Sequence, residues 1–362
     1  MRGFRVGLVA AVVVAGAIVV GPPAAASSSR SITCGGLVAY NAITGSLDTS
    51  KLMAIPATGG TPRVVWDGPG QGELDPAWSP DGRSIAFVGR TPPVTGPDGF
   101  AVADTRLYVL RSGESQPEVL VEQLGQRGGL RFPTWSPDGK RIAYATGVQP
   151  AGQAYKQLHW IHLIDVATKD DSFLTGVPDE RQPDQPVGAL VIPSLSWSPR
   201  GDRLLISALE SPGTSNWTIF SVRPDVTDPQ LTPLISNDPR IGAPVVAPAT
   251  GFPAFLPGGG AVLVEQDAPD YLSSRLYLAD PRFKHLLPVT APTGWDTQPD
   301  FGPSPLHAAF LHYNPDRTES SIAILTLPTG RFHSIVDPTP GTVVEQPDWQ
   351  PVLGCRPWPF AT

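Results

Sequence analysis

The sequence lacks an excess of positive charge. Among 362 residues, 26 Lys and Arg stand against 33 Asp and Glu, so the formal net charge is −7. Proteins that bind nucleic acid through its phosphates carry a basic patch or stripe. We therefore expect no nucleic-acid partner.

Common catalytic motifs are also missing. The sequence contains no Gly-x-Ser-x-Gly elbow, no His-Glu-x-x-His pair and no phosphate-binding loop. His159 and His162, like His307 and His312, are separated by odd numbers of residues, so each pair would lie on opposite faces of a strand. That arrangement is poor for joint metal ligation.

Proline and glycine, in contrast, are abundant. The chain has 43 prolines and 37 glycines, and it also has 41% hydrophobic residues, including 9 Trp, 13 Phe and 7 Tyr. Proline costs about 3 kcal/mol inside a helix, which excludes a helical bundle, while the aromatic content is enough to form a core. These observations predict an all-β fold with many short strands.

The N-terminus has the layout of a secretory signal peptide. Arg2 and Arg5 precede an uncharged apolar run from Val6 to Val20, and small residues end the segment at Ala26. The run is short for a membrane span, although an uncleaved anchor is the alternative. We expect a signal peptide at 1–26, a linker at 27–33 and a secreted, periplasmic or cell-envelope protein with no other span.

The rest of the chain repeats around an aromatic residue. Three copies contain Trp-Ser-Pro followed by Asp-Gly or Arg-Gly, two later copies are weaker, and a final half copy ends the series. The anchor aromatics are Trp78, Trp135, Trp197, Phe255, Phe301 and Trp349. A period of 40–60 residues with four strands per unit is typical of a propeller.

Both ends of the chain are needed to complete one repeat. Residues 36–40 resemble a second strand without a first, and residues 347–350 resemble a first strand without a second. We therefore expect a six-bladed β-propeller over residues 34–355, closed by pairing of the N- and C-terminal strands, with a tail at 356–362. Closure of this kind removes free sheet edges.

The repeated unit Trp-Ser-Pro-Asp-Gly, followed by Ile-Ala-Phe or Ile-Ala-Tyr, resembles the WD-like repeats of TolB-type propellers. Similar propellers are attached to prolyl-oligopeptidase-type enzymes. Both groups carry an α/β domain that the repeats do not supply, so we expect a stand-alone, monomeric propeller. The resemblance implies a binding platform, although a fold does not by itself define a function.

Cys34 and Cys355 are the two cysteines, and they flank the two terminal strands of the predicted propeller. In an exported chain this placement predicts a disulfide. The alternatives are a metal ligand and a reactive thiol.

The predicted loops differ between the two faces. The turns between first and second strands and between third and fourth strands are short, whereas four loops of the other face are long: 90–105, 147–156, 176–193 and 236–251. Acidic residues outnumber basic ones in the loops of this long-loop face. The face is either ordinary solvated surface or a site that attracts a cationic partner or a metal ion.

Residues just before the anchor aromatics should approach the propeller axis. Those with polar side chains are Glu73, Asp75, Asp296, Gln298, Glu345 and Gln346, which we take as candidate ligand-binding residues at the channel mouth. We expect no cofactor; if the channel binds a metal, these oxygen ligands would suit Ca²⁺. A water-filled polar channel is the alternative.

Two functions are compatible with these features. The first is non-catalytic binding of a protein, peptide or envelope polymer by the long-loop face. The second is a channel-mouth hydrolase or lyase, such as a lactonase or glycosidase, in which carboxylates such as Asp75 and Asp296 would act as a pair.

Overall fold

The computed structural model describes residues 36–96, 99, 101–126, 128–148, 158–176, 191–209, 217–227, 229–236, 250–291 and 293–351. Within these ranges the regular structure is β-strand apart from one short 3-10 turn, η1 (Leu47–Thr49), so the all-β prediction is confirmed there. No helix in this part of the chain has the length and apolarity needed to cross a bilayer. The predicted signal peptide, linker, tail and both cysteines lie outside the described residues.

One sheet joins the beginning and the end of the described chain. Its strand order is β25-β1-β2-β3, and β1 pairs antiparallel with both neighbours. The strands are β1 (Leu37–Thr44), β2 (Lys51–Pro56), β3 (Arg63–Trp66) and β25 (Thr342–Trp349). Beyond the ladder, the backbone N–H of Gln350 donates to the carbonyl of Leu37 at 2.9 Å. The predicted pairing of the two terminal strands is therefore confirmed.

Three further sheets are antiparallel and follow the chain order. The first contains β4 (Gly72–Trp78), β5 (Ser84–Arg90), β7 (Ala101–Arg111) and β8 (Glu118–Gln126), and the short β6 (Val94–Thr95) pairs with the start of β7. The second contains β9 (Gly129–Trp135), β10 (Arg141–Val148), β11 (Leu158–Asp165) and β12 (Asp171–Gly176). The third contains β13 (Val191–Trp197), β14 (Leu204–Leu209), β15 (Trp217–Val222) and β16 (Thr232–Ser236).

The remaining eight strands form one sheet made of two antiparallel meanders. The first meander is β17 (Thr250–Phe255), β18 (Val262–Asp267), β19 (Ser274–Ala279) and β20 (Leu286–Pro288). The second is β21 (Trp295–Phe301), β22 (His307–Tyr313), β23 (Ser320–Thr326) and β24 (Arg331–Val336). A single parallel pair, Ser274 with Trp295, connects them.

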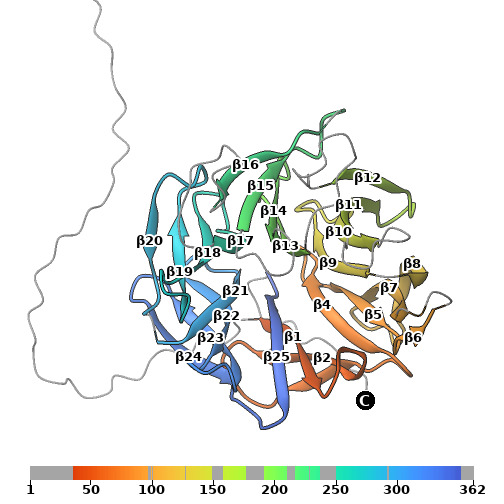
Figure 1. Cartoon of the computed structure of the whole chain (residues 1–362), viewed down its shortest axis with the longest axis horizontal. Helices are drawn as coiled ribbons and strands as arrows, with labels where there is room; N and C mark the ends of the chain where they lie inside the picture. Colours follow the sequence, from red (N-terminus) through yellow and green to blue (C-terminus); the bar gives the residue numbers. More distant parts are fainter. Residues whose placement is uncertain are drawn as a thin grey trace, which may run out of the picture. The chain divides into compact units, whose positions relative to one another are not determined.

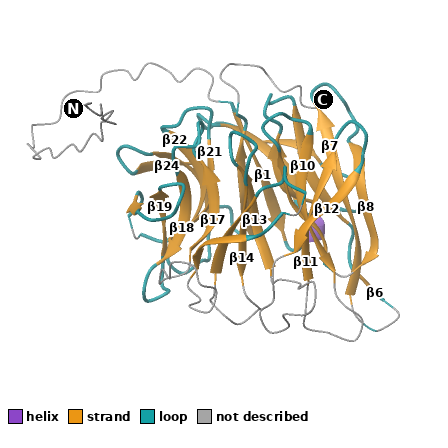
Figure 2. Cartoon of the chain, turned by 90° about the horizontal axis from the view of Figure 1, so that it is seen from above, coloured by secondary structure: helices purple, strands orange, loops and turns teal. Residues whose placement is uncertain are grey.

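The sheets are arranged around a common centre like propeller blades, with β4, β9, β13, β17, β21 and β25 innermost (Figure 1). In the turned view the strands run between two faces that carry the loops (Figure 2). The prediction of a long loop at 90–105 is wrong in part. Residues 101–105 belong to strand β7, where they pair with β6 and β8. Most of the other three long loops lies outside the described residues.

Each innermost strand contains a β-bulge at an X-Pro dipeptide. On β4 the pairing passes from Leu74–Val88 to Ala77–Ala86, so Asp75 and Pro76 together face one residue of β5. The equivalent dipeptides begin at Phe132, Ile192, Phe252, Gln298 and Gln346. Proline has no N–H and is tolerated within sheets at bulges and edge strands. The periodic prolines therefore determine where the inner strands bend.

The bulges force an unusual backbone conformation. In five of the six, the residue before proline has a φ between 46° and 55°, a region that residues with side chains rarely adopt. In each of these five strands the proline lies two residues before the anchor aromatic, whereas on β13 Pro193 lies four residues before it.

The anchor aromatics lie between neighbouring sheets, as predicted. Trp135 is buried against Ala86 and Val88 of the preceding sheet, and its indole N–H donates to the carbonyl of Ala77 at 3.1 Å. Trp197 repeats this contact one sheet further on, with the carbonyl of Thr134 at 3.1 Å. At these two positions the tryptophan therefore supplies both apolar burial and a hydrogen bond between sheets.

Candidate functional site

A channel at the centre of the sheets is lined by equivalent residues of the six innermost strands. One cavity of about 150 Å³ is lined by the residues three before each anchor aromatic: Asp75, Phe132, Ser194, Phe252, Gln298 and Gln346. A second cavity of about 200 Å³ lies beside the anchor aromatics. Both are lined by Thr134, Ser196, Asp300 and Asp348, so together they form one channel.

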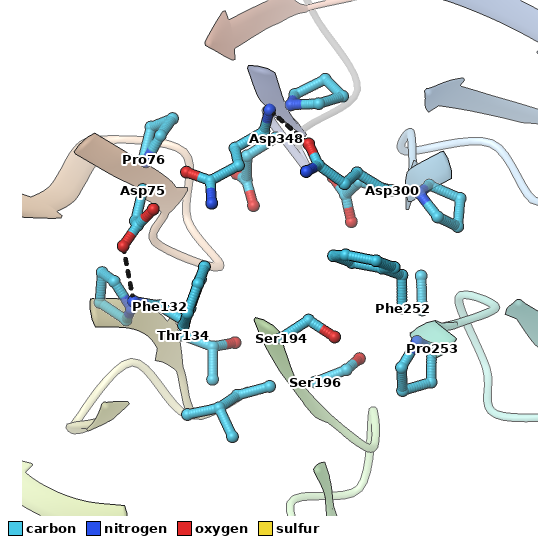
Figure 3. A pocket seen from close by; sticks show the side chains of 17 residues that line it. Asp75, Pro76, Phe132, Thr134, Ser194, Ser196, Phe252, Pro253, Asp300 and Asp348 are labelled. Atoms are coloured by element: carbon cyan, nitrogen blue, oxygen red, sulfur yellow. Dashed lines mark hydrogen bonds between the residues drawn. The ribbon is translucent and has the colours of Figure 1, made fainter. Parts of the chain in front are cut away.

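The walls of the first cavity differ in chemistry (Figure 3). Strands β4, β21 and β25 contribute carboxylates and amides, among them Asp75, Asp300 and Asp348. Strands β9, β13 and β17 contribute the phenyl rings of Phe132 and Phe252 together with hydroxyl groups. One part of the wall is therefore acidic, and the opposite part is apolar with hydroxyls.

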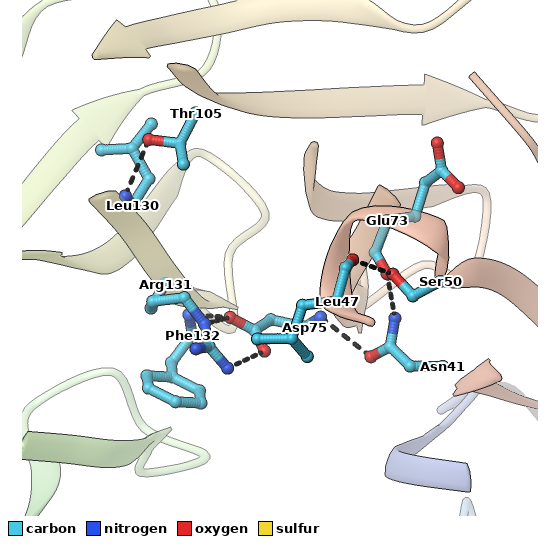
Figure 4. A network of polar contacts seen from close by, with 9 residues as sticks. All are labelled: Asn41, Leu47, Ser50, Glu73, Asp75, Thr105, Leu130, Arg131 and Phe132. Carbon is cyan, nitrogen blue, oxygen red and sulfur yellow. Dashed lines mark hydrogen bonds and ion pairs between the residues drawn. The ribbon is translucent and has the colours of Figure 1, made fainter. Parts of the chain in front are cut away.

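Asp75 is held by a network of polar contacts (Figure 4). Arg131 donates from Nε to Oδ2 at 2.6 Å and from Nη2 to Oδ1 at 3.0 Å, and the backbone N–H of Phe132 donates to Oδ2 at 2.9 Å. On the other side, the backbone N–H of Asp75 donates to Oδ1 of Asn41 at 3.0 Å. The negative charge of Asp75 is therefore already paired within the protein.

Three more predicted site residues, Gln298, Gln346 and Glu345, bear on this network, and the first two line the first cavity. Gln298 accepts a hydrogen bond at Oε1 from the backbone N–H of Gln346 at 2.7 Å, which fixes two predicted site residues to each other. Burial raises the pKa of Glu345. The positive charge of Arg131 lowers this pKa, and the negative charge of Asp75 raises it. Glu345 therefore lies within the electrostatic reach of the Asp75–Arg131 pair.

Asp300 and Asp348 form a second acidic group, deeper in the channel. Asp300 Oδ2 accepts from the backbone N–H of Trp349, and Asp348 Oδ1 accepts from that of Trp78, both at 2.7 Å. Burial raises the pKa of both carboxyls, and the proximity of Asp300 raises that of Asp348 further. No described Lys, Arg or His side chain forms an ion pair with either one.

The predicted residues Glu73, Asp296 and Glu345 do not line either cavity. Glu73 and Asp296 are 0% exposed; Glu73 accepts from the backbone N–H of Gly68 at 2.8 Å, and Asp296 Oδ1 lies 2.6 Å from Nδ1 of His312. Burial raises the pKa of Glu73 to about 8. Because Asp75 lines the channel and Asp296 does not, the structure does not bring this pair together for glycoside chemistry.

Sequence reasoning missed Arg131 as the partner of Asp75, and it missed four channel residues: Phe132, Phe252, Asp300 and Asp348. A signal for the last two was present, because Gln-Pro-Asp stands directly before the aromatic in both of their copies of the repeat. Among the described residues, no group of three or more His, Cys, Asp or Glu is arranged to hold a metal ion.

Comparisons with known proteins agree on the fold. No family model matches the chain. Dipeptidyl-peptidase 5 from Arthroderma otae is 25% identical over 181 residues, which is 48% of this chain and 22% of that protein. The match thus spans about a fifth of the curated relative.

Similar solved structures cover more of this chain than the curated relative does. TolB from Acinetobacter baumannii has a TM-score of 0.61 at 15% identity, covering 87% of this chain and 66% of that one. TolB from Agrobacterium tumefaciens has a TM-score of 0.54 at 16% identity, covering 85% and 98%. A prolyl endopeptidase structure has a TM-score of 0.52 at 16% identity, covering 86% and 49%. The chain therefore has a TolB-like β-propeller fold, which it shares with peptidase structures.

Proposed function

We propose that this protein is an exported, non-catalytic, six-bladed propeller with WD-like repeats, which binds a protein, peptide or envelope polymer at its long-loop face and channel mouth. The blade count is supported by the eight-stranded sheet, which divides at the Ser274–Trp295 pair into two four-stranded meanders. Each meander has its own X-Pro bulge and anchor aromatic.

The observation that carries the binding role is the channel itself. Equivalent positions of all six innermost strands line it, yet their side chains differ from strand to strand: carboxylate, phenyl, hydroxyl and amide. A purely structural core would not need this variety at one position. A concave site with a few fixed polar groups among apolar ones is typical of ligand recognition.

Acidic residues on or beside the innermost strands indicate the kind of partner. Asp75 and Glu345 lie within the electrostatic reach of Arg131, and Glu265 and Asp267 within that of Arg317. Burial is the main cause that raises the pKa of Glu265 to about 8 and that of Asp267 to about 6. A positively charged partner would restore the ionised forms, so we expect the partner to present cationic groups.

A pull-down from envelope extracts tests this function. The bait is the exported protein. The variants are Glu345→Gln, next to the channel residue Gln346, and Glu114→Gln in the turn between β7 and β8 as a charge-matched control. We expect a specific partner whose recovery falls roughly threefold to tenfold with Glu345→Gln alone. Failure to recover any specific partner, or equal loss with both variants, would contradict the proposal.

A channel-mouth hydrolase or lyase, with or without a metal such as Ca²⁺, is the second candidate. The observation that favours it is the Asp300–Asp348 pair, because neighbouring carboxyls with raised pKa values are common at catalytic sites. Turnover of lactone or glycan panels that is lost in Asp300→Asn would make this the better description. Metal analysis of the purified protein tests the calcium expectation.

A further inference from the structure

We propose that the channel binds a primary alkylammonium group, held between Asp300 and Asp348, with its methylene stem against Phe252. The proposal rests on the proposed binding role and names the chemistry that the channel would recognise. It concerns residues that lie deeper than the candidate mouth residues, at the level where the two cavities meet.

The first argument is uncompensated charge. Asp75 has Arg131 as its counter-charge at 2.6 Å, whereas Asp300 and Asp348 have no cationic side chain as a partner among the described residues. Two neighbouring carboxylates in a partly enclosed channel repel each other and bind either a proton or a cation. A ligand that brings one positive charge would replace the proton.

The second argument is the geometry of the two carboxylates. Each already uses one oxygen to accept a backbone N–H of the next strand, from Trp349 or Trp78. A guanidinium binds best when both oxygens of one carboxylate accept in parallel, and these strand contacts disfavour that arrangement. An ammonium needs single acceptors from several groups, which the pair can supply.

The third argument is a set of hydroxyl groups on the opposite wall. Thr134 and Ser196 line both cavities together with the two aspartates, and Ser194 lines the first (Figure 3). The Oγ of Ser194 is buried and has no hydrogen-bond partner among the described residues. An ammonium has three donors, so two carboxylates and one hydroxyl acceptor would satisfy it.

The fourth argument concerns the apolar part of the ligand. Phe132 and Phe252 line the same cavity, but the guanidinium of Arg131 already lies 4.4 Å from the centre of the Phe132 ring. Phe252 has no such cation above it among the described residues and packs beside Trp217 at 5.8 Å between ring centroids. Its ring can therefore cover the methylenes of a long amine.

Calcium fits this position less well. Calcium binds six to eight oxygen ligands, whereas no group of three or more His, Cys, Asp or Glu suited to a metal occurs in the described part of the chain. The observations therefore favour the organic cation.

Calorimetric titration of the full mature protein tests the proposal. The probes are 1,5-diaminopentane, the neutral 1-pentanol and 1,5-diguanidinopentane, which carries guanidinium groups but no ammonium. We expect the diamine to bind at least about tenfold more tightly than either of the others, since pentanol carries no charge and a guanidinium lacks the parallel pair of acceptors that it binds best. Equal binding of the diamine and pentanol, or tighter binding of the diguanidine, would overturn the proposal.

Variants locate the site. Asp300→Asn and Asp348→Asn keep an oxygen acceptor for the strand N–H but remove the charge, and Glu114→Gln is the control far from the channel. Diamine affinity should fall roughly tenfold or more in both channel variants and stay unchanged in the control. Thermal melts confirm that each variant is folded. Unchanged affinity in folded Asp300→Asn and Asp348→Asn would refute the site.

One further experiment identifies the source of the amine, and a second distinguishes failure of the ammonium site from failure of the proposed binding function. Tetrapeptides with a central Lys or with a free amino terminus but no Lys show whether a side chain or a chain terminus is the natural donor. If the envelope pull-down recovers a partner that neither diamine nor the Asn substitutions displace, the ammonium site is wrong and the binding function stands. If the diamine binds but no partner is recovered, only the binding function fails.

Discussion

Asp348 accepts a 2.7 Å hydrogen bond from the backbone N–H of Trp78, a residue 270 positions earlier in the chain. The bond joins the last described strand, β25, to β4, the innermost strand of the next sheet. Asp300 makes the same contact with Trp349 at 2.7 Å. These two aspartates therefore hold adjacent inner strands together while they line the channel.

Removing the carboxylate of Asp348 should destabilise the propeller. In Asp348→Ala the N–H of Trp78 loses its acceptor, which should lower the free energy of unfolding by about 1–3 kcal/mol. Asp348→Asn keeps an oxygen acceptor and should cost less. Urea unfolding at pH 5 measures both, and equal stability of the Ala and Asn variants would show that the bond contributes nothing.

The Asp75–Arg131 pair should show energetic coupling. A double-mutant cycle with Asp75→Asn and Arg131→Met should give a coupling on the order of 1–2 kcal/mol, reduced from the value of a fully buried pair because the Arg131 side chain is 29% exposed. Unfolding in denaturant measures the four free energies. Additive effects of the two substitutions would contradict a direct interaction.

Stability should fall as the pH rises from about 4.5 to 8. Burial raises the pKa of Glu73 to about 8, so within this window the folded protein keeps a proton that the unfolded chain releases. Each such carboxyl lowers the free energy of unfolding by about 1.4 kcal/mol per pH unit. Glu73→Gln, which cannot ionise, should show a shallower pH dependence than the wild type, and an unchanged slope would refute the role of Glu73.

The residues of positive φ at the bulges offer a test. Gln346 has a φ of 54°, so Gln346→Gly should stabilise the protein or leave it unchanged, whereas Gln346→Val should destabilise it by about 1–2 kcal/mol. Ser194 lies three residues before its anchor aromatic, as Gln346 does, but has no positive φ, so Ser194→Gly should destabilise by about 0.5–1 kcal/mol. Thermal unfolding compares the three, and stabilisation by both Gly variants would argue against a conformational cause.

The predicted disulfide can be tested directly. Cys34 precedes Leu37 by three residues and Cys355 follows Gln350 by five, and Leu37 and Gln350 are hydrogen-bonded. We expect the intact mass of exported protein to lie two hydrogen masses below that of the reduced chain, and reduction to lower the stability by up to about 5 kcal/mol. Two free thiols in the exported protein would refute the pairing.

Residue patterns predict the fold well but the site only in part. The wedge position of Trp135 and the pairing of β1 with β25 follow from the register of the repeat, and the structure confirms both. Asp75, Gln298 and Gln346 are predicted in the channel and line it. Glu73, Asp296 and Glu345 also precede an anchor aromatic, but they lie beyond the bulge and line neither cavity.

By itself, the sequence determined the all-β class, the repeating strand unit and the place of each turn and bulge, because proline, glycine and the anchor aromatics act on their own neighbours. Only the tertiary structure decided which groups on different sheets form ion pairs and hydrogen bonds. Arg131 pairs with Asp75 across 56 positions, and Asp348 meets Trp78 across 270. Such contacts depend on the distances between side chains and backbone groups of neighbouring sheets, which the repeat pattern does not specify.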